Sequence, residues 1–207
     1  MTSNFIKETS VINALEDLSK KTFSTIPLGT MKETSVTDNI LSEIQLRSKN
    51  ADIIQYDDSY KETGKKNDNI KTRTCADYIL IIKDKNGNIH KMAFQAKNGQ
   101  KDNTNKIGNK YNAITHRIGN HGDYQIDAYD SFLKISGITG YYIFYNGNFD
   151  EIRNSNSQNK LRGESFWVLD EKTIKLKMGT GYKVLSLDDV VNEKGHLEFT
   201  KFLKENL

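Results

Sequence analysis

The sequence has very little of the two residues that most restrict a backbone covalently. Cys75 is the single cysteine among 207 residues, and Pro27 is the single proline. One cysteine excludes an intrachain disulfide and a zinc site built from several cysteines. With one proline, turns must depend on glycine, asparagine and aspartate. The fold therefore has to be held by a hydrophobic core.

Long apolar runs and a strong net charge are also missing. No stretch approaches the roughly 20 apolar residues of a membrane span, and the first residues, MTSNFIKETS, contain no signal-peptide hydrophobic region. We therefore expect a cytoplasmic protein with no membrane partner. The formal net charge is +3, so nucleic-acid contact would require locally concentrated basic groups. The length fits a single domain, residues 1–207.

The spacing of apolar residues predicts a mixture of helices and strands. Helical spacing is found in residues 8–23, 33–47, 122–137, 185–191 and 195–207. Strand patterns are found in residues 51–58, 76–84, 89–97, 138–147, 165–170 and 173–179. The segment 76–84 is apolar on both faces, which is typical of a central strand. We predict an α/β fold in which α-helices sandwich a mixed β-sheet.

Three polar side chains are expected at one end of this sheet. Gln95 and Lys97, in the stretch FQAK, lie two residues apart on one strand and so point to the same side. Asp77 begins the preceding strand, and in an antiparallel hairpin that start lies beside the end of the next strand. Each residue also has a plainer explanation: a loop cap for Asp77 and a solvated strand end for the other two.

A glutamate on the second predicted helix is a fourth candidate. Glu33 lies on the same helical face as Val36, Ile40 and Ile44, so it should point inward. The structural alternative is a first-turn acid that favours the helix dipole. Glu43, on the same helix, competes with it for a catalytic role.

This pattern resembles the PD-(D/E)xK nuclease superfamily, which has the restriction-endonuclease-like fold. Its signature is an acid on one strand, then an acid or glutamine, a spacer and a lysine on the next strand. A helix that supplies a glutamate usually precedes it. Asp77 and Gln95-Ala96-Lys97 match the signature, with Ala76 in place of the proline.

The resemblance extends over about residues 30–147. The stretches ETSVTDNIL, ADYILII, FQAKN, YQID and YYIFYNG occur in the order expected of a bacterial branch known only as a domain of unknown function. Residues 148–207 would then be a C-terminal elaboration packed on the core. The resemblance implies an endonuclease that hydrolyses double-stranded DNA, with a role in bacterial or mobile-element defence. A homodimer is one expected state, because two sites are needed to cut two strands.

The resemblance also implies a role for each site residue. Asp77, Gln95, the Ala96 carbonyl and Glu33 would hold Mg²⁺, for which Mn²⁺ could substitute; magnesium prefers oxygen ligands. Lys97 would hold the attacking water or stabilise the charge that develops on the phosphate. Gln95 would be a weaker, neutral ligand in the place of a second acid.

Basic residues flank this proposed site in the sequence. The expected phosphate contacts are Lys71, Arg73, Lys101, Lys106, Lys110 and Arg117. The resemblance adds Gln125, on the following helix, as a residue that supports the lysine or contacts phosphate. Solvated loops are the alternative explanation for the lysine-rich stretches.

Three other functions are compatible with these residues. The first is an RNA-directed nuclease of the same fold. The second is a nucleic-acid-binding module that keeps the fold with little or no catalysis, which Gln95 makes worth considering. The third is an interaction protein, such as an inhibitor or a subunit, which would have an exposed apolar patch.

Overall fold

The computed structural model describes residues 3–26, 31–56, 73–100, 110–118, 122–147, 165–191 and 197–206. Within these residues the fold is mixed α/β, as predicted, around a six-stranded sheet. None of the described helices is long and apolar enough to cross a membrane.

The sheet has the strand order β1-β2-β3-β7-β8-β10. Its strands are β1 (Ala51–Gln55), β2 (Tyr78–Lys83), β3 (Ile89–Asn98), β7 (Thr139–Tyr145), β8 (Phe166–Asp170) and β10 (Leu197–Glu198). The β3 and β7 strands are parallel, and the other neighbours are antiparallel. Residues from the C-terminal part of the chain therefore complete the same sheet that contains the β2–β3 hairpin.

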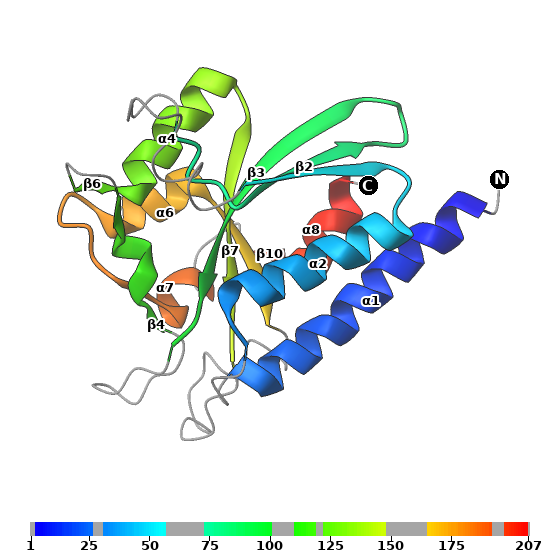
Figure 1. Ribbon diagram of the computed structural model, residues 1–207, viewed down its shortest axis with the longest axis horizontal. Coiled ribbons are helices and arrows are strands. Elements are labelled where there is room, and N and C mark those ends of the chain that lie inside the picture. Colours follow the sequence, from blue (N-terminus) through cyan, green and yellow to red (C-terminus); the bar gives the residue numbers. More distant parts are fainter. Residues whose placement is uncertain are drawn as a thin grey trace.

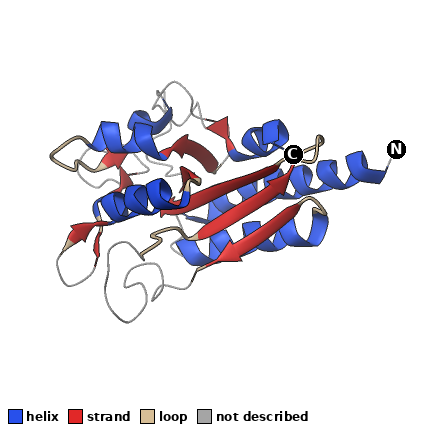
Figure 2. Cartoon of the chain, turned by 90° about the horizontal axis from the view of Figure 1, so that it is seen from above, coloured by secondary structure: helices blue, strands red, loops and turns tan. Residues whose placement is uncertain are grey.

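Helices cover both faces of the sheet (Figure 1). One face carries α1 (Ser3–Thr25), α2 (Glu33–Arg47) and α8 (Phe199–Asn206), and the other carries α4 (Gln125–Ser136) and α6 (Glu171–Met178). Figure 2 gives the same arrangement from above, with the strands in red. Side chains alternate along β3 and therefore contribute to the hydrophobic cores on both faces of the sheet. Phe94 packs toward α8, whereas Ala93 lies in the core of α4 and α6.

Shorter elements border the second face. They are β4 (Lys110–Tyr111), the 3-10 helix η3 (Asn112–Thr115), β5 (Arg117–Ile118), β6 (Asp123–Tyr124), β9 (Leu185–Ser186) and α7 (Leu187–Val191). The β4 strand pairs with β9, and β5 pairs with β6. The β4–β9 pair joins the segment before α4 to the segment after α6, and the β5–β6 pair lies just before α4.

The predicted strand over residues 173–179 is wrong, because these residues belong to helix α6. Asp170 caps that helix, since its side chain accepts a hydrogen bond from the Thr173 backbone N–H at 2.9 Å. Ile174 and Met178 are buried at helical spacing, while Leu176 between them is 81% exposed. The alternating apolar residues of 173–179 are therefore compatible with a strand or a helix, and the Asp170 cap favours the helix.

Gly140 on β7 lies against Leu133 of α4. A Cβ atom at this position would lie 2.1 Å from Leu133 Cδ1, and the rest of the Leu133 branch is within 3.0 Å. The absence of a side chain on β7 therefore lets Leu133 of α4 pack against the strand.

We predict that Gly140→Ala lowers the free energy of unfolding by about 1–3 kcal/mol, because the buried Leu133 side chain must move. Gly181→Ala is the matched control, since a Cβ there would meet nothing within 4 Å. Urea unfolding of both variants measures the difference. In a Leu133→Ala background, Gly140→Ala should lower the free energy of unfolding by less. An equal loss in both backgrounds would show that contact with Leu133 is not the cause of the destabilisation.

Candidate functional site

The Asp77 carboxylate holds the start of β2 to the end of β3. Its Oδ2 atom accepts hydrogen bonds from Gln95 Nε2 and from the Ala96 backbone N–H, each at 2.6 Å. The Asp77 backbone N–H donates to the Phe94 carbonyl at 2.8 Å, which extends the ladder of the hairpin. Asp77 and Gln95 are therefore direct neighbours across the strands, and both are buried.

The Gln95 amide oxygen is a buried acceptor without a donor. The amide nitrogen donates to Asp77 and approaches the Ala96 carbonyl at 3.2 Å. The Oε1 atom has no hydrogen-bond partner among the described residues, although it is shielded from solvent. Buried polar atoms are nearly always paired, so this oxygen identifies a place where a ligand could complete the site.

Lys97 places a positive charge on the same face of the sheet. It lies opposite Phe144 in the β3–β7 ladder, and Phe144 belongs to the core under α4. Lys97 is only 3% exposed, and within the described part of the chain nothing forms an ion pair or hydrogen bond with its ammonium group. A lysine that is almost completely buried and lacks a protein counter-ion is costly, so a ligand with negative charge would suit this position.

Glu33 reaches the end of β3 from the other side of the sheet. It is the first residue of α2, and its Oε2 atom accepts a hydrogen bond from the Asn98 backbone N–H at 2.8 Å. Glu43 instead forms a 2.5 Å ion pair with Arg47 in the last turns of the helix. Of the two competing glutamates, Glu33 is therefore the one that lies against the strand bearing Lys97.

Gln125 begins α4 and is also buried. Its backbone N–H donates to the His116 carbonyl at 2.9 Å, and its own amide oxygen has no partner in the described chain. The α4 helix leads into β7, which runs parallel to β3, so its first turn lies toward the end of β3 that carries Lys97. This position would allow α4 to direct the positive end of its dipole toward an anion at the site.

The predicted phosphate contacts have different surroundings. Arg73 is 1% exposed and its Nη1 atom lies 3.4 Å from Asp123 Oδ2, so its guanidinium is buried within the protein. Arg117 is exposed and lies over the ring of Tyr124, 4.1 Å from its centroid, while Lys110 is half-buried on β4. The predictions for Lys71, Lys101 and Lys106 fall outside the described residues.

Two structural features of the site leave no signal in the sequence. The Asn98 backbone N–H, which anchors Glu33, carries no residue-specific signal. Cys75 adopts a positive φ of 49°, which is unusual for a residue with a side chain. This backbone conformation lies just before Asp77 and redirects the chain into β2, and only the three-dimensional structure could reveal it.

The donor set fits a hard divalent cation. The candidate ligands are the carboxylates of Asp77 and Glu33, the open Gln95 Oε1 atom and the Ala96 carbonyl, and all of them are oxygen ligands. The described residues contain no cluster of three or more histidine, cysteine, aspartate or glutamate side chains. A cation here would therefore depend on amide and backbone oxygens in addition to two carboxylates.

Comparison with known proteins gives a family without an assigned activity. Residues 9–194 match a family described as "Family of unknown function (DUF6615)". No curated protein matches the chain.

We predict that Asp77→Ala lowers the free energy of unfolding by about 2–4 kcal/mol, because two buried N–H donors lose their acceptor. Asp77→Asn should cost clearly less, since its amide oxygen can still accept a hydrogen bond. Urea unfolding in EDTA measures both without any contribution from metal. Equal losses in the two variants would mean that the hydrogen bonds to Asp77 do not hold the hairpin together.

Proposed function

The chain belongs to this family of unknown function (DUF6615), and we propose that it is a metal-dependent endonuclease that hydrolyses DNA phosphodiester bonds. One observation carries the proposal. At the end of the β2–β3 pair, a buried carboxylate, a buried amide oxygen without a donor and a buried lysine without a counter-ion lie together. An open acceptor suits a cation, and an unpaired ammonium suits a phosphate.

The order of these residues also supports a restriction-endonuclease-like fold. The glutamate comes from a helix that precedes the hairpin, the aspartate from the start of β2, and the glutamine and lysine from β3. This is the order that the resemblance to the PD-(D/E)xK superfamily implies. The mixed sheet with helices on both faces is compatible with it.

Asp77, Gln95, the Ala96 carbonyl and Glu33 are the residues that would hold Mg²⁺ or Mn²⁺. The bound cation would neutralise phosphate charge and make water a better nucleophile. Because the donor set includes a neutral amide, the chain supplies only two negative charges here. We therefore propose modest metal affinity.

Lys97 would act on the scissile phosphate itself. Negative charge increases on the phosphate oxygens as the bond to water forms, and a nearby ammonium stabilises that charge. The stabilisation is strongest where water is excluded, and Lys97 is almost completely buried. Since no described protein group competes for its proton, Lys97 would be available to donate a hydrogen bond to the phosphate or to the attacking water.

A specific observation also favours a second candidate function, a binding module without catalysis. Gln95 already donates a hydrogen bond to Asp77, so the Asp77 carboxylate has protein donors in the absence of a cation. Such a module would bind nucleic acid equally well with and without Mg²⁺. The two functions therefore differ in whether metal ions cause cleavage of the bound nucleic acid.

We predict metal-dependent cleavage of supercoiled plasmid DNA that Lys97→Met reduces by about 100-fold or more, because a donor to the developing charge is lost. Lys91→Met, an exposed lysine on the same strand, is the matched control and should cut like the parent. Rates are compared in Mg²⁺, Mn²⁺ and EDTA, on plasmid and on matched RNA. If Lys97→Met cuts at the parental rate, the site assignment is wrong; binding without any cleavage would favour the binding module.

Gln95→Glu tests the cation site without relying on activity. In EDTA this variant should lose about 1–3 kcal/mol of stability, because a hydrogen bond to Asp77 becomes a repulsion between carboxylates. Addition of Mg²⁺ should then raise its melting temperature more than that of the parent, since a stronger ligand has been introduced.

Gln55→Glu is the matched control for this substitution. Gln55 also donates to an aspartate, Asp38, at 2.7 Å, but at an exposed position. Thermal unfolding of that variant should depend little on Mg²⁺. A Gln95→Glu protein that is as stable as the parent in EDTA and gains nothing from Mg²⁺ would contradict the cation site.

A further inference from the structure

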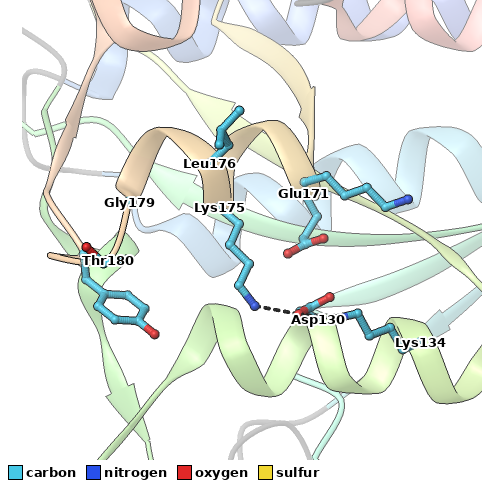
Figure 3. Close-up of a pocket in the computed structure, with 9 residues that line it drawn as sticks. Asp130, Lys134, Glu171, Lys175, Leu176, Gly179 and Thr180 are labelled. Carbon is cyan, nitrogen blue, oxygen red and sulfur yellow. Dashed lines mark hydrogen bonds and ion pairs between the residues drawn. The ribbon is translucent and has the colours of Figure 1, made fainter.

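A cavity lies between α4 and α6, on the same face of the sheet as Lys97, and none of the residues of the proposed cation site line it (Figure 3). Its volume is about 570 Å³, which is within the range of small-ligand sites. Lys134 of α4 and Lys172, Lys175 and Leu176 of α6 line it, together with Glu171.

Glu171 is the unexplained group in this cavity. It is the first residue of α6, is 3% exposed and projects toward α4 in Figure 3. Its Oε1 atom is shielded from solvent, and the described residues donate no hydrogen bond to it. Burial, and then the nearby Asp130, raise the pKa of Glu171 to about 7. A ligand with N–H donors would supply what the protein does not.

The charges around Glu171 restrict that ligand. Asp130 is neutralised by Lys134 at 2.8 Å and Lys175 at 2.5 Å, and Lys175 also pairs with Asp127 at 3.0 Å. The exposed Lys172 adds a further positive charge at the rim, and no ion pair joins it to the described chain. Because Lys134 and Lys175 already pair with carboxylates, Lys172 is the positive charge that remains at the rim to attract an anion. The ligand should therefore offer neutral N–H donors to Glu171 and a negative group to the rim.

A nucleotide combines these two properties. Uracil and thymine present one ring N–H between two carbonyl oxygens, which would repel a carboxylate, whereas adenine and cytosine pair one amino donor with an adjacent ring acceptor. Guanine alone presents two adjacent donors, from its ring N–H and its amino group, which match the two oxygens of a carboxylate. Leu176 and the lysine methylenes offer apolar contacts for the flat base.

We propose that this cavity binds a guanine nucleotide, with the base on Glu171 and the phosphate at Lys172. The nucleotide could be free or part of a bound nucleic-acid chain, and both offer the same chemistry. The proposal does not depend on cleavage. It can therefore be tested in an Asp77→Asn background, where failure of the nuclease proposal has no effect on the result.

The test is isothermal titration calorimetry of the full chain at pH 8, where Glu171 is mainly ionised. The probes are GMP, AMP, CMP, UMP and inorganic phosphate, followed by short oligonucleotides with and without guanine. GMP should bind at least 10-fold more tightly than UMP. Glu171→Gln should remove this preference, and because it removes a buried charge it should not destabilise the fold. Asp52→Asn, an exposed carboxylate on β1, is the matched control and should change nothing.

Lys172→Met tests the phosphate end of the proposed nucleotide site. This variant should weaken all four mononucleotides alike and leave the preference for guanine intact. If only the oligonucleotides bind, and their binding requires guanine and is lost in Glu171→Gln, the site is supported and its ligand is a nucleic-acid chain rather than a free nucleotide. Equal binding of all bases, binding that ignores Glu171→Gln, or no binding of any probe would overturn the proposal.

Discussion

The hydrogen bonds that Asp77 accepts across the β2–β3 hairpin are the constraint on which the rest of the site depends. They join the carboxylate to both the side chain of Gln95 and the backbone N–H of Ala96. Side chains alternate along a strand, so a slip of one residue would move Gln95 and Lys97 to the face covered by α2. By fixing the register, one buried acid also determines where a buried lysine and an open amide oxygen lie.

The end of β3 is also where groups from both faces of the sheet can meet. The sheet separates α2 from α4, so a side chain on one helix cannot pass through to the other side. Glu33 avoids this barrier by binding the Asn98 backbone N–H, at the last residue of the strand. A cation site that uses both Glu33 and Gln95 is therefore restricted to this end of the sheet.

The sequence predicted those features that depend on local pattern. The paired strands and the neighbourhood of Asp77 and Gln95 followed from alternation and hairpin geometry, both of which are properties of nearby residues. Helix α6 was mistaken for a strand because Ile174, Leu176 and Met178 alternate, and the exposure of Leu176 depends on tertiary packing. Because of the same error, Glu171 fell between two predicted strands, where nothing in the sequence indicated that it would be buried. Backbone features, such as the positive φ of Cys75, leave no pattern at all.

Two of the buried acceptors without a described donor on this face, Gln95 Oε1 and Glu171 Oε1, differ in what would satisfy them. Gln95 Oε1 is neutral and lies beside a carboxylate, so a cation gains from both groups. Glu171 is itself acidic but is surrounded by lysines that already neutralise Asp130, so neutral N–H donors suit it better than a cation. Each unpaired buried acceptor costs about 1–3 kcal/mol, from a total stability of about 5–15 kcal/mol. Because Gln95 and Glu171 call for ligands of different chemistry, their costs fit two ligand sites on this face rather than one.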